Sequence, residues 1–291
     1  MHDLAALSRI FSARITRELA TDAYSPLLGR LLRQTGLLSK EMQNDRVEDV
    51  MGAAFSELTQ LGKRDDYVFR SAIVQKILLG RHSLNTSTLL NEFRIGKSRV
   101  DLAILNGKST AYEIKSDRDS LKRINSQLDD YAKFFEEVYV VTSENRQNEV
   151  IASIPESTGL LILTSASKPA LRTIRKSQNH TSQNDPEIIS DSLRLSEAKE
   201  LLTLLGCEIP TAPNTIVRQL LRSEFKQLGP ELVNKATLEV LKKTRNTRTL
   251  SGSISSVPEF LRASVLCTQL TAPHVETYLQ ALARSAHTMG K

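Results

Sequence analysis

Two carboxylates and one lysine lie within fifteen residues of this chain, at a spacing that could do chemistry. Asp101 lies in the segment 99–105, and Glu113 and Lys115 lie in the segment 111–115. Carboxylate oxygens are ligands that Mg²⁺ prefers, and a positioned ammonium group can stabilise developing negative charge. If the two segments form a β-hairpin with these side chains on one face, that face becomes a candidate Mg²⁺ site.

Local sequence patterns predict this hairpin. Both segments alternate with the period of a strand, and Asn106-Gly107 between them is a strong turn signal. Residues that pair across an antiparallel ladder share a face, so Asp101 and Glu113 share one only if paired numbers sum to an even value. A three-residue loop, Leu105-Asn106-Gly107 with the glycine in the left-handed conformation, meets this condition. A two-residue Asn-Gly loop would separate the carboxylates across the sheet.

A second hairpin is predicted upstream, where the segments 89–95 and 98–105 flank Gly96-Lys97, with glycine at the first position of a type II′ turn. In that register Glu92 lies opposite Asp101. Alternation then predicts an apolar core face made of Phe93, Ile95, Val100, Leu102, Ile104, Tyr112 and Ile114. The other face is predicted to carry charged groups separated by small residues, namely Glu92, Arg94, Arg99, Asp101, Ala103, Ala111, Glu113 and Lys115. A solvated strand surface remains an alternative for any one of these charges.

The neighbouring segments predict the elements that would hold this hairpin in place. A helix is predicted from about Ser120 to Glu137, with Tyr131 in its apolar stripe and Gln127 one turn earlier, next to Arg123. Three further elements follow it, a strand at 138–142, a short helix at 145–154 and a strand at 159–164. An amphipathic helix is predicted before the hairpins, at 66–81. The order is helix, three antiparallel strands, helix, strand, helix, strand.

This order and its polar residues resemble the PD-(D/E)XK nuclease superfamily. The residues that carry the resemblance are Asp101, Glu113-Ile114-Lys115 after a gap of eleven residues, and Gln127-x-x-x-Tyr131, which resembles the RecB-like branch. The resemblance covers about residues 66–165. Val100 stands before the aspartate in place of proline, and no histidine lies where some RecB-like members place a metal ligand. The fold class expected is α/β, with a restriction-endonuclease-like core flanked by helical N- and C-terminal regions.

The resemblance implies a Mg²⁺-dependent nuclease in which Mn²⁺ would substitute. It assigns Asp101, Glu113 and the Ile114 carbonyl as metal ligands, with Glu92 as an outer ligand. Lys115 would orient the attacking water or help to deprotonate it, and would stabilise negative charge at the phosphate. Gln127 and Tyr131 would contact the nucleic-acid backbone or support the metal site, although core packing is an equally good interpretation of Tyr131. The setting implied is bacterial or phage defence, restriction or repair.

Composition limits the function classes further. The net charge of +6 and the pI near 9.3 favour a polyanionic partner. The five histidines and two cysteines show no ligand or pair spacing, so we expect neither a zinc site nor a disulfide framework. No glycine-rich phosphate loop occurs, so nucleotide hydrolysis is not expected. No signal peptide or apolar run of about 18 residues occurs, so a cytoplasmic protein without membrane contact is expected.

The chain divides into four predicted regions. These are a helical N-terminal region (1–65), the nuclease-like domain (66–175), a linker (176–190) and a helical C-terminal domain (191–291). The residues predicted to bind nucleic acid are Arg99, Arg123, Arg218, Arg222, Lys242, Lys243, Arg245 and Arg248, although a solvated basic helix end would also explain the C-terminal ones. DNA is the expected partner, with RNA, a homodimer and a protein partner left open. The alternative function is a catalytically silent module of the same fold that binds nucleic acid or protein.

Overall fold

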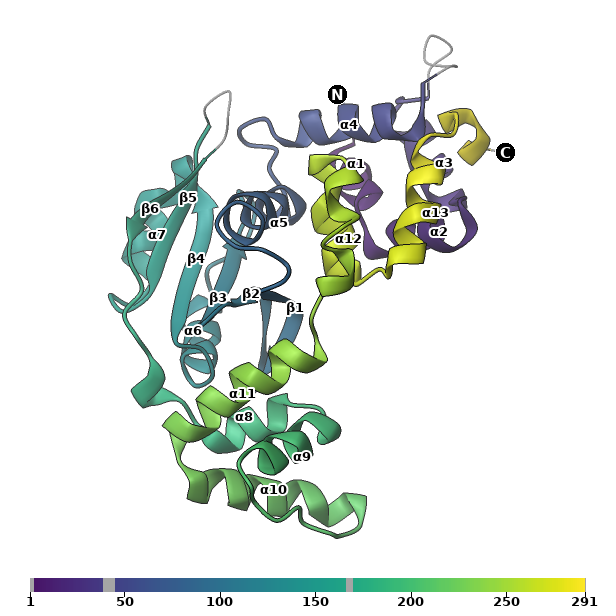
Figure 1. Cartoon of the computed structure of the whole chain (residues 1–291). Coiled ribbons are helices and arrows are strands. Elements are labelled where there is room, and N and C mark those ends of the chain that lie inside the picture. The colour runs from purple at the N-terminus through teal and green to yellow at the C-terminus, as the bar shows by residue number, and fades with distance from the viewer. Residues whose placement is uncertain (1–2, 39–44, 166–169, 291) are drawn as a thin grey trace.

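The computed structural model describes residues 3–38, 45–165 and 170–290. In these ranges thirteen α-helices surround one six-stranded sheet (Figure 1). The α/β class predicted from the sequence is therefore confirmed. The predicted regions 1–65, 66–175 and 191–291 also include residues 1–2, 39–44, 166–169 and 291, which lie outside the described residues.

The sheet has the strand order β1-β2-β3-β4-β5-β6. Its strands are β1 (Thr88–Ile95), β2 (Ser98–Leu105), β3 (Ser109–Lys115), β4 (Glu137–Ser143), β5 (Gly159–Leu163) and β6 (Leu171–Arg175). The first three form an antiparallel meander. β3, β4 and β5 run parallel because α6 (Ile124–Ala132) and α7 (Gln147–Ser153) cross over between them. The sequence patterns did not predict β6, which pairs antiparallel with β5.

Both predicted hairpins form, and one needs a correction. The β1–β2 register pairs Ile95 with Ser98, as predicted, and Gly96 has a φ of 54°. The β2–β3 register pairs Leu105 with Ser109, so the loop is residues 106–108, one residue later than predicted. Gly107 takes the left-handed conformation with a φ of 72°. The paired numbers still sum to an even value, and the ladder ends at Leu102–Tyr112, directly before Asp101 and Glu113.

The prediction of one apolar and one polar sheet face is wrong, because apolar clusters cover both faces. Leu102, Ile104, Tyr112 and Ile114 belong to one cluster. Phe93, Ile95 and Val100 belong to the other, together with Ala103 and Ala111, which were predicted on the polar face. The alternation reverses at Glu92, whose φ of 52° is left-handed. Glu92 and Asp101 are also absent from the regular pairs of the ladder. A non-glycine residue in this conformation breaks the two-residue repeat.

The helix predicted at 120–137 is shorter than expected. Residues before α6 form turns, because the Asp119 carboxylate accepts a hydrogen bond from the Ser116 amide at 2.8 Å. The Arg146 guanidinium donates to the carbonyls of Ser116 and Asp119, at 2.6 and 2.8 Å. These contacts give the backbone an alternative to helix.

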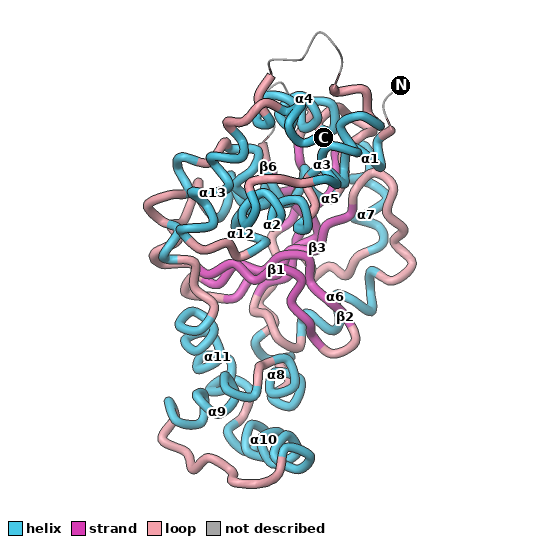
Figure 2. The backbone as a smooth tube through the Cα atoms, turned by 90° about the vertical axis from the view of Figure 1, so that its right-hand side faces the viewer, coloured by secondary structure: helices cyan, strands magenta, loops and turns pink. Residues whose placement is uncertain are grey.

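Two groups of helices cover the sheet (Figure 2). The first contains α1 (Leu4–Ile10), α2 (Ala13–Asp22), α3 (Pro26–Gln34), α4 (Val47–Leu58), α5 (Asp66–Ile73, continued by a π-helical turn at Val74–Leu78), α12 (Arg262–Thr268) and α13 (Ala272–Leu282). The second contains α6, α8 (Pro186–Ser192), α9 (Leu195–Leu204), α10 (Asn214–Leu228) and α11 (Pro230–Thr244). The predicted C-terminal domain is thus divided, since α12 and α13 pack with the N-terminal helices. No helix in the described ranges combines the length and apolar character needed to span a membrane.

The segment predicted as a linker, 176–190, packs against the rest of the molecule. Asn184 is buried, and its amide donates to the Ala132 carbonyl at 3.0 Å. Its side-chain oxygen accepts a 2.6 Å hydrogen bond from Asn234 of α11. This segment therefore joins α11 to the end of α6.

Candidate active site

Glu113 and Lys115 lie side by side at the end of β3, under helix α6. The Lys115 Nζ donates to Glu113 Oε1 at 2.7 Å and to Gln127 Oε1 at 3.0 Å. Both charged side chains are buried, with Glu113 2% and Lys115 7% exposed. The β3–α6–β4 crossover brings α6 over this point, and Gln127 and Tyr131 face it together because they are one turn apart. The structure thus brings together four of the predicted site residues.

Tyr131 supports Glu113. Its ring is fully buried in an apolar cluster, and its hydroxyl lies 2.7 Å from Glu113 Oε2 and 2.8 Å from the Arg99 carbonyl. Burial and the neighbouring Glu113 raise the pKa of this phenol well above its usual value, so it stays a hydrogen-bond donor. Of the predicted interpretations of Tyr131, this buried position fits core packing and support of the site from inside.

Asp101 fills the gap where β2 and β3 separate. The ladder between them ends at the Leu102–Tyr112 pair, and beyond it Asp101 Oδ2 accepts a 2.7 Å hydrogen bond from the Ile114 amide. Burial raises the pKa of Asp101 to about 8, with further contributions from the negative charges of Glu113 and Asp66. The two predicted carboxylates therefore face the same gap closely enough to repel each other.

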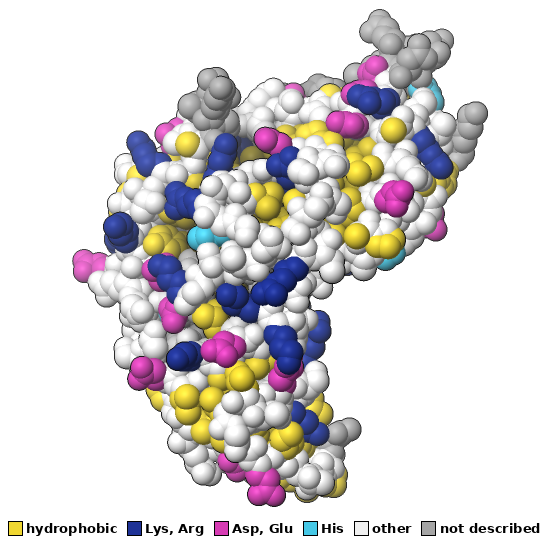
Figure 3. Space-filling model, in the orientation of Figure 1, with side chains coloured by type: hydrophobic (Ala, Val, Ile, Leu, Met, Phe, Trp, Pro, Cys, Tyr) yellow, Lys and Arg dark blue, Asp and Glu magenta, His cyan; other side chains and the backbone are white. Residues whose placement is uncertain are grey.

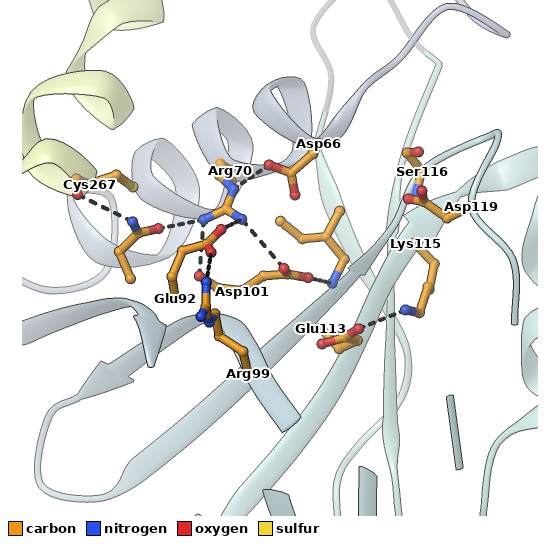
Figure 4. A network of polar contacts seen from close by, with 12 residues as sticks. Asp66, Arg70, Glu92, Arg99, Asp101, Glu113, Lys115, Ser116, Asp119 and Cys267 are labelled. Carbon is orange, nitrogen blue, oxygen red and sulfur yellow. Dashed lines mark hydrogen bonds and ion pairs between the residues drawn. The ribbon is translucent and has the colours of Figure 1, made fainter. Parts of the chain in front are cut away.

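Arg70 of α5 is a site residue that the sequence patterns missed (Figure 4). Its Nε donates to Asp66, and its Nη1 donates to Asn91 and, at 3.0 Å, to the Asp101 carbonyl. Its Nη2 lies 2.9 Å from Glu92 Oε1 and 3.4 Å from Asp101 Oδ1. The available signal was the Asp66–Arg70 pair, four residues apart at the start of the helix that precedes the hairpins.

Glu92 and Ile114 also lie at the site. The Glu92 carboxylate pairs with Arg70 and, at 3.3 Å, with Arg99. Its side chain is 47% exposed, so it forms the solvent side of the site. The Ile114 group that touches another site residue is its N–H, bound to Asp101. Among the described residues, no three His, Cys, Asp or Glu side chains are grouped so as to hold a metal ion.

Some of the predicted basic residues could reach a polyanion, and of these Arg99 is paired with Glu92. Arg123 is exposed at the start of α6, and Arg99 is largely exposed beside Glu92. Lys242 and Arg248 have no acidic partner within the described ranges. Figure 3 shows Lys and Arg side chains gathered at the waist of the molecule, where α11 leads towards α12.

The other predicted basic residues have partners. Arg222 and Lys243 form exposed ion pairs with Asp191 and Glu200. The guanidinium of Arg218 donates to two backbone carbonyls at the end of α8. Arg245 binds Glu197 through two 2.7 Å hydrogen bonds and lies over the Phe93 ring. Its assignment to a phosphate contact is therefore corrected to a structural role.

The fold and site define a mixed α/β protein with a buried acid–lysine cluster at a split in its sheet. The chain belongs to the family described as Bacteriophage P4 protein cII, whose profile it matches over residues 60–255. It is similar to "Protein cII" of Enterobacteria phage P4, with 33% identity over 125 residues. That alignment covers 42% of this chain and 47% of the phage protein, so the chain spans about half of its relative. No solved structure matches the chain.

The family match covers the sheet and the candidate site. Residues 60–255 contain α5, the whole sheet and the helices α6–α11, and so they include every residue of the candidate site. The helices outside the match are α1–α4, α12 and α13, which pack together at one end of the molecule.

Proposed function

We propose that this protein is a Mg²⁺-dependent nuclease with a restriction-endonuclease-like core of the PD-(D/E)XK type. The observation that carries the proposal is the convergence of Asp101, Glu113 and Lys115 at one split in the sheet, with Gln127 and Tyr131 of α6 bound to two of them. This set spans 31 residues, and a chance grouping of solvated charges would not bury Glu113 and Lys115.

The donor set is compatible with a divalent cation. Two carboxylates are enough for Mg²⁺, which keeps several waters. The pKa of Asp101, raised to about 8, reflects burial and the nearby negative charges of Glu113 and Asp66, which a cation would offset. Asp101, Glu113 and the Ile114 carbonyl would hold the metal ion. The chemistry that Mg²⁺ supplies when bound is neutralisation of phosphate charge and activation of water.

The residues of the chain would do the remaining work. Lys115, held in place by Glu113 and Gln127, would orient the nucleophile and stabilise charge at the phosphate. Tyr131 would fix the Glu113 carboxylate through its hydroxyl. Arg99, Arg123, Lys242 and Arg248 would hold the nucleic-acid backbone without reading its sequence. DNA in a phage or bacterial setting is the proposed substrate, in line with the phage relative.

A second candidate function is a silent module that keeps the fold and binds nucleic acid or a protein. The observation that favours it is the Arg70 guanidinium, which already neutralises part of the acidic cluster. In addition, both oxygens of Glu113 already accept hydrogen bonds.

Cleavage assays separate the two candidates. The full chain is incubated with linear, circular, single-stranded and branched DNA and with RNA, in Mg²⁺ or Mn²⁺. We expect Asp101→Asn and Lys115→Met each to lower the cleavage rate at least about 100-fold, because each removes a charge that acts at the phosphate or metal. Asp129→Asn is the matched control, since Asp129 is exposed on the outer side of α6. Cleavage that persists in both site variants would contradict this site, and a folded wild type inert on all substrates would favour the silent module.

A further inference from the structure

Arg70 satisfies every donor that it has. An arginine offers five N–H groups, and those of Arg70 meet five acceptors on α5, β1 and β2. Three of these acceptors are carboxylate oxygens, belonging to Asp66, Glu92 and Asp101. Its side chain is 11% exposed, so little water screens these charges. The guanidinium is therefore the cation that the acidic cluster holds in this structure.

The contacts of Arg70 are unequal. Those to Asp66, Asn91 and Glu92 are 2.9 Å or shorter, whereas Nη2 lies 3.4 Å from Asp101 Oδ1. A hydrogen bond of that length is weak. The contact between Arg70 and the carboxylate of the proposed metal ligand is therefore the one that breaks most easily.

A cavity beside Arg70 gives the guanidinium room to move. The cavity has a volume of about 370 Å³ and is lined by Arg70, Asp66 and Glu92 on one side and by Ser12 and Cys267 on the other. The Ser12 hydroxyl is buried and has no hydrogen-bond partner in the described ranges. Arg70 and Ser12 line the same cavity, so a guanidinium that leaves Asp101 has space to enter while it keeps its ion pair with Asp66.

We propose that Arg70 is a built-in counterion that competes with divalent metal for the carboxylates of Asp101 and Glu92. The proposal rests on the metal site of the proposed function. A metal ion binds at Asp101 when Arg70 withdraws towards Ser12, and Arg70 offsets part of the negative charge of the cluster when metal is scarce. Metal affinity is thus set by a residue that is not itself a ligand.

The test is Mn²⁺ binding by the full chain, measured from the loss of the electron paramagnetic resonance signal of free Mn²⁺ at fixed pH. We expect Arg70→Gln to bind Mn²⁺ at least about ten-fold more tightly than wild type, because a positive charge within about 4–6 Å is removed. Arg70→Lys keeps the charge and should stay close to wild type. Arg70→Gln combined with Asp101→Asn should lose the gain, which locates it at this site.

A second variant acts without touching the acids or Arg70. Ser12→Leu adds bulk at the wall of the cavity, takes up part of its space and should weaken Mn²⁺ binding several-fold, whereas Ser12→Ala leaves the space open and should change it little. Ser12 makes no side-chain cap for α2, so neither change removes a helix cap. Circular dichroism and thermal unfolding report whether each variant is folded, and Ser12→Leu still decides the question if Arg70→Gln does not fold.

The outcomes separate this inference from the nuclease proposal. Mn²⁺ binding that is unchanged or weaker in folded Arg70→Gln, or unchanged in Ser12→Leu, overturns the counterion while wild-type cleavage still supports the nuclease. A wild type that cleaves nothing, with Arg70→Gln showing tighter binding that depends on Asp101, overturns the nuclease and keeps the counterion. Absence of Mn²⁺ binding in every variant overturns both.

Discussion

At the scale of single residues, the site concentrates opposite charges in a small, partly buried volume. Four carboxylates, Asp66, Glu92, Asp101 and Glu113, meet two cations, Arg70 and Lys115. Negative charge is in excess in this cluster. The pKa of Asp101 is raised to about 8 by burial and by the negative charges of Glu113 and Asp66. Such a carboxylate lowers the stability of the folded chain when it is ionised.

This raised pKa predicts a pH dependence of stability. Between the unfolded pKa near 3.9 and the folded value of about 8, the folded chain binds more protons than the unfolded chain. The contribution of Asp101 therefore makes stability fall as pH rises from about 4 to 8 and level off above that. Asp101→Asn keeps a side-chain oxygen that can accept the hydrogen bond of the Ile114 amide. It should remove a pH-dependent loss of stability on the order of a few kcal/mol.

The measurement is urea unfolding at pH 5 and pH 8 with a chelator present. We expect wild type to lose more free energy of unfolding between these values than Asp101→Asn does. Asp129→Asn is again the control, and it should follow wild type. If the free energy of unfolding changed equally with pH in wild type and Asp101→Asn, the pKa of Asp101 would not be raised in the folded chain.

Much of the site could be predicted from local patterns, because the residues that specify its hairpins are close together in the sequence. Asn106-Gly107 and Gly96-Lys97 specify the two hairpins, and strand parity then aligns Asp101 with Glu113. The left-handed conformation of Glu92 has no such signal, since a glutamate rarely adopts it. Its tertiary contacts with Arg70 and Arg99 hold it there, so sequence patterns could not predict the reversal of faces.

At the scale of elements, a buried ion pair fastens the second helical group to edge strand β1. Glu197 of α9 is buried and accepts hydrogen bonds from Arg245 and from Thr244, at the end of α11. The Arg245 guanidinium lies 4.9 Å from the centre of the Phe93 ring. One acid therefore links two helices to the strand that carries Glu92.

Removal of this acid should be costly. Glu197→Ala leaves Arg245 buried without its partner, and we expect a loss of about 3–5 kcal/mol in the free energy of unfolding. Glu200→Ala on the same helix removes an exposed pair with Lys243 and should cost no more than about 1 kcal/mol. Urea denaturation of both variants gives the comparison, and equal losses would refute a special role for Glu197.

At the scale of the whole molecule, the division of the C-terminal region could not be predicted from sequence. Each helix from α8 to α13 shows an ordinary amphipathic pattern. This pattern predicts a buried face but does not specify the element against which that face packs. The Arg284 guanidinium donates to the Ala23 carbonyl at 2.9 Å across 261 positions of sequence. Arg70 was missed for the same reason, because Asp101 is 31 positions away.

Two cations near the C-terminal end of α11, Lys242 and Arg248, predict how the molecule holds nucleic acid. Lys242→Ala combined with Arg248→Ala should weaken DNA binding on all sequences and reduce the slope of log affinity against log salt by about 2, since each phosphate contact contributes about 0.9. Arg14→Ala combined with Arg17→Ala removes the same charge from exposed positions on α2 and should leave the slope unchanged. Fluorescence anisotropy at several salt concentrations measures both, and an unchanged slope in the first variant would exclude these two residues.

The joint packing of the first and last helices has a consequence for synthesis on the ribosome. The Val47 amide donates to the Arg284 carbonyl, and the Ala286 amide donates to the Asp45 carbonyl, both at 2.9 Å. Helices α1–α4 are therefore synthesised before α12 and α13, against which they pack. Their apolar surfaces stay exposed until those helices have been made. The nascent chain completes this bundle only after the sheet between its two halves has been translated.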